Sequence, residues 1–252
     1  MQKIIITGAT SGIGKALAFE FSKRGYAVGI AGRRIERLQE IQQQLPNCYI
    51  QAMDVTNISA GTIELQTLIE KLGGMDALII NAGVGFIHPT FEETDQIISV
   101  NVRAFTHQAQ FALQYFIDNK SNGRIVGISS LATHIATSGT ELYSASKAFV
   151  SRYWQGLRQT ARATGLGISV TEIRPGYVKS EMTAGQKGMF WLADTDKAAR
   201  QIADATESGA RVAYITRRWR LLAWLLYIMP DAWVDALLLK SLKKLAPTKQ
   251  SS

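Results

Sequence analysis

The sequence predicts an α/β domain built on a doubly wound, mostly seven-stranded parallel sheet with helices on both faces. The first observation is a set of short apolar segments typical of buried strands, at about residues 3–7, 27–31, 49–53, 77–80, 124–129, 168–173 and 211–215. The second is that helical patterns separate most of them, which favours parallel strands joined by right-handed crossovers. Such sheets bind ligands at the carboxyl ends of their strands.

Length and composition indicate one domain. A chain of 252 residues with 46% hydrophobic residues can bury a sizeable core. We expect residues 1–216 to form this domain and residues 217–252 to be a basic, apolar helical extension of it. The single cysteine, Cys48, excludes an internal disulfide and a multi-cysteine metal site. Because the first predicted strand begins at residue 3, no signal peptide is expected, and a cytoplasmic location follows by default.

The first predicted strand runs directly into a glycine-rich turn at residues 8–14 (GATSGIG), followed by an apolar-periodic helix through Leu17, Phe19 and Phe21. Glycines in such a turn let the backbone approach a pyrophosphate, and the helix directs free N–H groups and its positive dipole end at the phosphates. The spacing Gly-x-x-x-Gly-x-Gly differs from the common Gly-x-Gly-x-x-Gly fingerprint, so only the mechanism transfers. The turn therefore predicts a dinucleotide site.

The second predicted strand ends without a carboxylate. An acid there would accept hydrogen bonds from a free ribose 2′-hydroxyl and repel a 2′-phosphate. Gly32 occupies this position instead, and Arg33 and Arg34 follow with planar guanidinium groups suited to a phosphate. The dipole of the next helix disfavours cations at its start, so their placement favours a bound anion. This pattern predicts a preference for NADP(H) over NAD(H).

Further polar and turn residues come directly after the later strands. Residues 81–83 (NAG) follow the fourth strand, Ser129 and Ser130 the fifth, and Pro175 and Gly176 the sixth. Parallel strands end at one edge of a sheet, so these residues are expected beside the glycine-rich turn.

Tyr143 and Lys147 are four residues apart and share one face of a predicted helix. A free phenol has a pKa of about 10 and exchanges protons poorly at neutral pH unless a nearby cation favours its anion. Lys147 could supply that cation. The pattern Tyr-x-x-x-Lys is a weak signal by itself, so the acid–base role depends on the motifs around it.

Together these segments resemble the short-chain dehydrogenase/reductase family, with the motifs in family order over roughly residues 3–215. The resemblance implies a Rossmann-type fold and a catalytic tetrad of Asn101, Ser130, Tyr143 and Lys147. Ser130 lies thirteen residues before Tyr143, the usual family separation, which selects it over Ser129. With Arg33 and Arg34, the expected cofactor contacts are Gly8, Thr10, Ser11, Gly12, Ile13, Gly14, Asp54, Val55, Asn81, Ala82, Gly83, Tyr143, Lys147, Pro175, Gly176, Val178 and Ser180.

The resemblance also assigns roles to these contacts. Asp54 and Val55 would touch the adenine ring, and residues 81–83 would stabilise the central strand. Pro175 and Gly176 would form the turn next to the nicotinamide. Ser180 stands where many members carry Thr, and it keeps a hydroxyl for the carboxamide.

The implied chemistry is hydride transfer between a nicotinamide and a carbonyl or alcohol group. In reduction, Tyr143 would protonate the developing alkoxide while Ser130 hydrogen-bonds the same oxygen. Lys147 would lower the pKa of Tyr143 and hold the nicotinamide ribose, and Asn101 would hold a water that links Lys147 to solvent.

The three histidines do not offer a competing site. His88, His107 and His134 show no metal-ligand spacing, so no metal is expected. His134 lies four residues after Ser130 in a predicted substrate-side loop, and we expect a plain loop histidine because no partner for it is evident.

The segment after Pro175 and Gly176 bears on the substrate. It carries four large apolar residues before a helix that starts near Thr195 or Asp196, namely Met182, Met189, Phe190 and Trp191. These residues suit a lid over a hydrophobic, lipid-like carbonyl compound, or they pack on the sheet or a partner subunit.

Two alternative functions stay open. One is a reductase or dehydrogenase of small polar hydroxy acids, for which Arg174, Lys179 and Lys187 are available as a carboxylate-binding cation. The other is a regulatory protein that binds the cofactor without turnover. The complete tetrad favours an enzyme, because a pure binder has no need of Ser130, Tyr143 and Lys147 together.

The carboxyl-terminal residues are basic and apolar. Residues 211–252 hold eight Lys or Arg against two Asp, so six of the eight net positive charges lie there. The apolar run 221–229 is too short to span a bilayer, which takes about 20 residues. Residues 217–245 could instead contact an anionic membrane surface, a neighbouring subunit or the substrate cleft. No nucleic-acid platform accompanies the charge, and the resemblance implies a homodimer or homotetramer.

Overall fold

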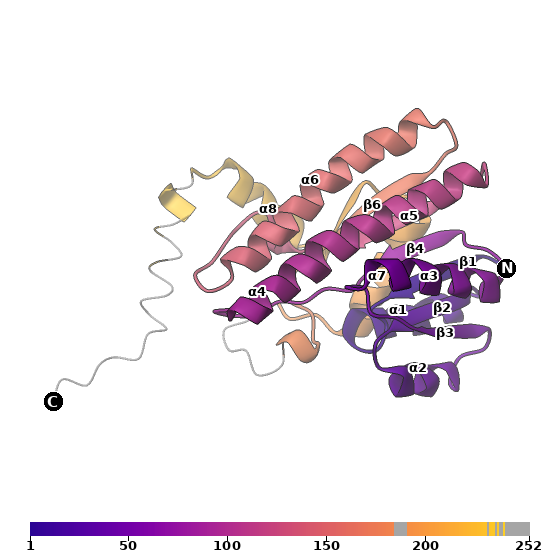
Figure 1. The fold of residues 1–252 in the computed structure, drawn as a ribbon. Helices are drawn as coiled ribbons and strands as arrows, with labels where there is room; N and C mark the ends of the chain where they lie inside the picture. Colours follow the sequence, from indigo (N-terminus) through magenta and orange to yellow (C-terminus); the bar gives the residue numbers. More distant parts are fainter. Residues whose placement is uncertain (184–190, 231, 235, 237–238, 240–252) are drawn as a thin grey trace.

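The computed structural model describes residues 1–183, 191–230, 232–234, 236 and 239 (Figure 1). Within them, seven strands form one sheet: β1 (Lys3–Thr7), β2 (Ala27–Gly32), β3 (Cys48–Ala52), β4 (Ala77–Ile80), β5 (Arg124–Ile128), β6 (Ser169–Pro175) and β7 (Val212–Ile215). All neighbours are parallel, in the order β3-β2-β1-β4-β5-β6-β7. The predicted doubly wound fold is therefore confirmed, with strand ends within two residues of the expected positions.

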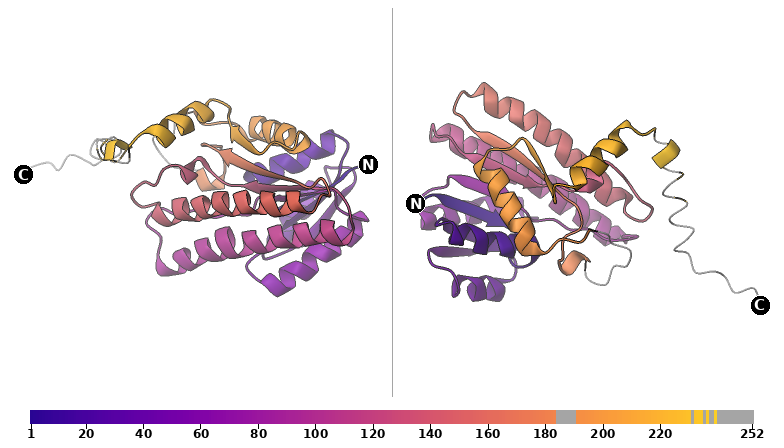
Figure 2. Two further views of the ribbon diagram at one scale, coloured as in Figure 1. Left: turned by 90° about the horizontal axis from the view of Figure 1, so that it is seen from above. Right: turned by 180° about the vertical axis from the view of Figure 1, so that it is seen from behind.

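Helices cover both faces of this sheet (Figure 2). One face carries α1 (Gly12–Lys23), α2 (Ile35–Gln42) and α7 (Thr195–Glu207), whose buried residues share one core cluster. The opposite face carries α3 (Ile58–Leu72), α5 (Phe105–Asp118) and α6 (Glu141–Ala163), which share the second cluster. Shorter elements complete the described chain: α4 (Phe91–Ile97), the π-helix η1 (Ile98–Ala104), the 3₁₀ turns η2 (Leu131–Thr133) and η3 (Glu181–Thr183), and α8 (Trp219–Ile228).

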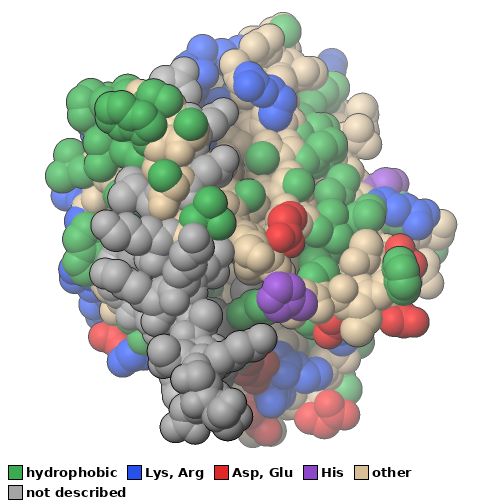
Figure 3. Space-filling model, turned by 90° about the vertical axis from the view of Figure 1, so that its left-hand side faces the viewer, with side chains coloured by type: hydrophobic (Ala, Val, Ile, Leu, Met, Phe, Trp, Pro, Cys, Tyr) green, Lys and Arg blue, Asp and Glu red, His purple; other side chains and the backbone are tan. Residues whose placement is uncertain are grey.

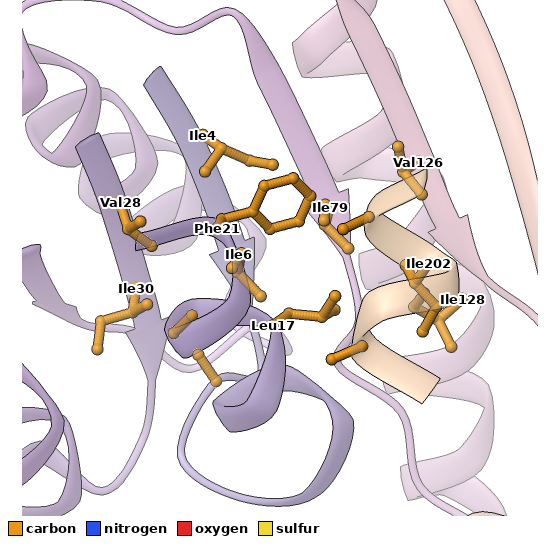
Figure 4. Packing of buried hydrophobic residues seen from close by; sticks show 14 of the residues in the cluster. Ile4, Ile6, Leu17, Phe21, Val28, Ile30, Ile79, Val126, Ile128 and Ile202 are labelled. Carbon is orange, nitrogen blue, oxygen red and sulfur yellow. The ribbon is translucent and has the colours of Figure 1, made fainter. Parts of the chain in front are cut away.

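The interior strand β1 shows why the strands appear as continuous apolar runs. Ile4 and Ile6 are fully buried in the cluster under α1, and Ile5 between them is fully buried in the cluster under α3. A parallel strand covered on both faces has no solvent side, so the apolar pattern does not alternate. Figure 4 shows Ile4 and Ile6 packed against Leu17 and Phe21 of α1.

Arg24 joins the first helix of the chain to the last helix before β7. At the end of α1, its guanidinium lies 2.8 Å from Glu20, 2.8 Å from Asp204 and 2.6 Å from Glu207. Because Asp204 and Glu207 belong to α7, these ion pairs connect α1 to α7 across about 180 residues of sequence.

Helix α7 begins at Thr195, as the sequence predicts. Its N-cap is Asp194, whose side chain makes no capping hydrogen bond. The carboxylate pairs instead with Lys179 at 2.6 Å. Of the apolar residues predicted to cover the substrate, Met189 and Phe190 lie outside the described residues.

The expected carboxyl-terminal extension is described mainly through α8, which ends before Pro230. The part of this extension from residue 231 onward lies largely outside the described residues. Within the described residues, no helix has both the length and the apolar character needed to cross a bilayer.

Candidate active site

The turn between β1 and α1 is built against the segment after β4. Gly8 has a φ of +67°, and a Cβ at this position would lie 2.7 Å from the Cα of Ala82. The Asn81 amide donates hydrogen bonds to the carbonyls of Thr7 at 3.2 Å and Gly8 at 2.9 Å. A Cβ on Gly14 would meet the Gly8 carbonyl at 2.4 Å. The residues predicted to form and support the glycine turn are therefore packed together.

The first turn of α1 is arranged to receive an anion. Its N-cap, Ser11, makes no side-chain capping bond, and the turn contains no acidic residue. The N–H groups and positive dipole end of the helix are thus left without a carboxylate. The loop after β6 passes nearby, since a Cβ on Gly12 would lie 3.3 Å from the Cβ of Ser180. These features fit the phosphates of a dinucleotide.

The two predicted arginines lie differently after β2. Arg34 donates from Nη2 to the Thr10 hydroxyl at 2.7 Å and the Ser11 hydroxyl at 3.1 Å, so it borders the glycine turn. Arg33 is exposed near Asp54. Burial raises the pKa of the Asp54 carboxyl, but hydrogen bonds from Thr56 and the charge of Arg33 leave the pKa lowered overall.

Two charged residues next to Arg34 were not predicted from the sequence, the acidic Glu181 and the basic Arg37. Glu181 of η3 accepts a hydrogen bond from Nη1 of Arg34 at 3.0 Å and pairs with Arg37 of α2. Arg37 lies three residues after Arg34, one helical turn away, which is the one sequence signal that could have identified it. Nothing local to Glu181 indicates that it faces α2.

Tyr143 and Lys147 lie on one face of α6, as predicted. The Lys147 Nζ lies 5.7 Å from the centroid of the Tyr143 ring and donates to the Ile128 carbonyl at 3.1 Å. Only 4% of Lys147 is exposed. The Tyr143 ring packs over Gly85, where a Cβ would lie 2.9 Å from Cδ2, so Gly85 makes room for the ring.

Burial dominates the protonation of this pair. It lowers the pKa of Lys147 to about 8. It also raises the pKa of Tyr143, which a hydrogen bond with Ser130 partly opposes. The expected lowering of the Tyr143 pKa by Lys147 is not what the structure shows, because desolvation of the phenol outweighs the other effects.

Asn101 lies in the π-helix η1 and is fully buried. Its Nδ2 donates to the Val84 carbonyl at 2.8 Å and to the Ser146 hydroxyl at 3.1 Å, and its Oδ1 accepts from the Val84 N–H at 2.9 Å. A Cβ on Gly83 would lie 3.5 Å from Oδ1 of Asn101 and 3.4 Å from Nζ of Lys147. Gly83 therefore lies in ordinary contact range of both side chains.

The two serines after β5 face different groups. Ser130 hydrogen-bonds Tyr143, and its hydroxyl accepts from the Ala132 N–H at 3.1 Å. Ser129 is buried, and its hydroxyl lies 3.4 Å from the Lys147 carbonyl. Ser130 is thus the serine placed beside the Tyr143 hydroxyl.

The segment after β6 leads from the sheet to α8. Gly176 donates its N–H to the Ile215 carbonyl at 2.7 Å, and a Cβ there would lie 2.2 Å from the Trp219 ring. Val178 is buried and forms an isolated bridge with Ala193. The Ser180 N–H donates to the Thr183 hydroxyl at 2.9 Å. The remaining predicted contacts, Ile13 and Val55, are partly buried against the two core clusters.

His134 has partners, contrary to the expectation of a plain loop histidine. Its Nε2 lies 3.0 Å from the Tyr214 hydroxyl and 2.9 Å from Nη1 of Arg174. Arg174 also binds both carboxylate oxygens of Glu172, at 2.8 and 3.0 Å. Burial and the charge of Arg174 lower the pKa of His134. The two partners of His134 come from β6 and β7, 40 and 80 residues along the chain.

Two of the three cations considered for binding a polar substrate, Arg174 and Lys179, already pair with carboxylates. Arg174 is held by Glu172, which is fully buried, and Lys179 pairs with Asp194 at 2.6 Å. The third, Lys187, lies outside the described residues.

The sequence matches a known protein family. The model of the short chain dehydrogenase family matches residues 2–189. An 11-beta-hydroxysteroid dehydrogenase A of Sesamum indicum is 31% identical over 193 residues, covering 73% of this chain and 54% of that protein. A sulfoacetaldehyde reductase of Chromohalobacter salexigens is also 31% identical over 193 residues, covering 73% of this chain and 76% of that protein.

A solved structure shares the fold of the described residues. A short-chain dehydrogenase from Sphingobium yanoikuyae, in complex with NADPH, covers 100% of this chain and 98% of its own, with a TM-score of 0.76 and 24% identity. The sequence match, the fold and the order of the motifs agree. The chain belongs to the short chain dehydrogenase family.

Proposed function

We propose that the protein is an NADP(H)-dependent oxidoreductase that interconverts a carbonyl and an alcohol, with Tyr143 as general acid and base. The observation that carries this proposal is the grouping of Ser130, Tyr143, Lys147 and Asn101 beside the glycine turn. Bound NADP(H) would supply or accept the hydride. These side chains come from η1, from the segment after β5 and from α6, and they meet at the carboxyl edge of the sheet.

The acid–base step is supported by the environment of the pair. In reduction, Tyr143 donates its proton to the oxygen of the substrate, and the Ser130 hydroxyl hydrogen-bonds the same oxygen. A pKa of about 8 gives Lys147 access to both protonation states near neutral pH, so it can help to return a proton to Tyr143. Asn101 hydrogen-bonds the backbone N–H and carbonyl of Val84 and so fixes this segment next to the pair.

The preference for NADP(H) is supported by the position of Arg34 and by the lack of room for a side chain at Gly32. A Cβ on Gly32 would lie 2.7 Å from Cγ2 of Thr10, so a carboxylate has no room there without a shift. Arg34 lies against Thr10 and Ser11 at the edge of the turn, where its guanidinium can face a 2′-phosphate.

A hydrophobic substrate is supported by the aromatic residues after β6. Trp219 packs edge-on against Tyr177 at 5.8 Å and Trp191 at 5.1 Å between ring centroids. Together these rings give the segment next to Gly176 an apolar character. The hydroxysteroid activity of the sesame relative fits this choice. The sulfoacetaldehyde activity of the bacterial relative fits the polar alternative, which the pairing of Arg174 and Lys179 with carboxylates makes less favourable.

We further propose that α8 contacts an anionic membrane surface. Its inner side is fixed by Trp219, which is 1% exposed, whereas Leu221 is 74% and Trp224 63% exposed. Figure 3 shows hydrophobic side chains gathered on the side of the molecule that carries α8. Residues 216–230 contain three arginines and no acid, so two copies of this surface would repel each other, while anionic headgroups would be attracted.

Vesicle co-sedimentation tests the membrane contact. Changing Leu221 and Trp224 to Asp should abolish sedimentation with anionic vesicles, and Ile63→Asp, at an exposed apolar residue of α3, should not. Equal sedimentation of the wild type with neutral and anionic vesicles, or of the double variant with the wild type, would exclude the proposal.

The test of the enzymatic function is the initial rate of NADPH oxidation with carbonyl compounds graded in chain length and polarity. Rates should rise with apolar chain length and be lost in Tyr143→Phe, which should still bind NADPH. Turnover near the wild-type rate in Tyr143→Phe would remove Tyr143 from the chemistry. An inactive panel with tight NADPH binding would favour a binding protein without turnover.

A further inference from the structure

Glu181 holds the two arginines at the end of the predicted 2′-phosphate site. Both oxygens of its carboxylate face Nη1 of Arg34, at 3.0 and 3.3 Å, and one of them pairs with Arg37. Arg34 and Arg37 belong to the β2–α2 region, whereas Glu181 begins η3 after β6. The contact therefore joins the β2–α2 region to the loop after β6, over 144 to 147 residues of sequence.

The carboxylate competes for the part of Arg34 that a phosphate would use. The Nη2 and Nε atoms of Arg34 bind the Thr10 hydroxyl, so Nη1 is the nitrogen that points away from the turn, and Glu181 occupies it. Arginine binds phosphate best through two parallel N–H groups. A phosphate placed against Arg34 would thus meet a carboxylate of the same charge at close range.

This carboxylate does not lose its charge at neutral pH. Hydrogen bonds from Arg37 and Arg34 hold the pKa of Glu181 at about 2. Its side chain is 55% exposed, and those of Arg34 and Arg37 are 41% and 43% exposed, so the ion pairs can exchange with a ligand from solvent. An exposed ion pair of this kind is weak enough to be replaced by a dianion.

We propose that Glu181 is a specificity-determining residue that acts as an internal stand-in for the 2′-phosphate and is displaced when NADP(H) binds. This inference rests on the proposed preference for NADP(H). The exchange releases η3, whose preceding residue, Ser180, lies over the N-terminus of α1. Recognition of the 2′-phosphate on α2 is thereby linked to the loop after β6, and a cofactor without this phosphate leaves the ion pairs in place.

Calorimetry with 2′,5′-ADP and 5′-AMP tests the proposal without any turnover, because only the first carries the 2′-phosphate. Glu181→Gln should tighten 2′,5′-ADP about fivefold, the scale of an exposed ion pair. It should leave 5′-AMP unchanged. The matched control is Glu36→Gln, which removes the same charge from an exposed residue between Arg34 and Arg37 that makes neither ion pair. This control should change neither affinity by more than about twofold.

Other results would overturn either the displacement of Glu181 or the preference for NADP(H). If Glu181→Gln weakens both ligands, the ion pairs act as a clasp over the bound nucleotide and Glu181 is not a stand-in. If it changes neither, or if Glu36→Gln has an equal effect, the displacement is also wrong. If the wild type binds 2′,5′-ADP no better than 5′-AMP, the NADP(H) preference fails and the inference fails with it.

Discussion

Replacing Lys147 by Met removes a cation that the fold buries at a free-energy cost. The pKa of Lys147 falls from 10.5 to about 8 in the folded protein. Each unit corresponds to about 1.4 kcal/mol, so the neutral form is favoured by about 3 kcal/mol relative to the unfolded chain. Between pH 8 and 10.5 the unfolded chain holds more protons at this residue, and stability therefore rises with pH in this window.

The comparison of the two proteins isolates this effect. We expect the free energy of unfolding of the wild type, minus that of Lys147→Met, to increase by about 2 kcal/mol between pH 7 and pH 9.5. Urea denaturation followed by circular dichroism measures both values, and groups that titrate in both proteins cancel in the difference. A difference that stays constant with pH would show that Lys147 is not desolvated as the structure implies.

Two further changes test the packing around the site, each by thermal or urea denaturation. Gly8→Ala should cost about 3 kcal/mol and weaken NADPH binding, because it adds a 2.7 Å contact with Ala82 to the strain of a positive φ. Gly25→Ala should cost only about 1 kcal/mol, because Gly25 has a similar φ but open space around it. Equal losses of stability in the two variants would refute the proposed effect of the Gly8–Ala82 contact. Arg174→Met should cost about 3 to 5 kcal/mol by leaving Glu172 buried and unpaired. A loss below about 1 kcal/mol, the value expected for Lys179→Met at its exposed pair, would contradict this reasoning.

The fold could be predicted from sequence because its signals are local. A parallel strand buried on both faces produces an uninterrupted apolar run, and residues 3–7 show this clearly. The positions where strands end then place residues 81–83 beside the glycine turn by topology alone, and the structure has the Asn81 amide bound to the Gly8 carbonyl.

Side-chain partners from distant parts of the chain could not be predicted in this way. The pairing of Glu181 with Arg34 and Arg37 depends on how the loop after β6 crosses the sheet edge. The contacts of His134 depend on residues of β6 and β7 that the sheet order brings near it. The spacing of Tyr143 and Lys147 gave their shared face correctly, but not the burial that raises the pKa of the phenol.

The ion pairs of Arg24 bear on how the chain reaches its native state. Part of the apolar side of α1 around Phe21 packs on the sheet, and the rest is covered once α7 packs beside it, where Arg24 binds Asp204 and Glu207. Closing a contact over some 180 residues carries a large loop entropy and slows folding. A nascent chain that lacks α7 exposes this surface, so it is prone to aggregate until synthesis passes residue 207.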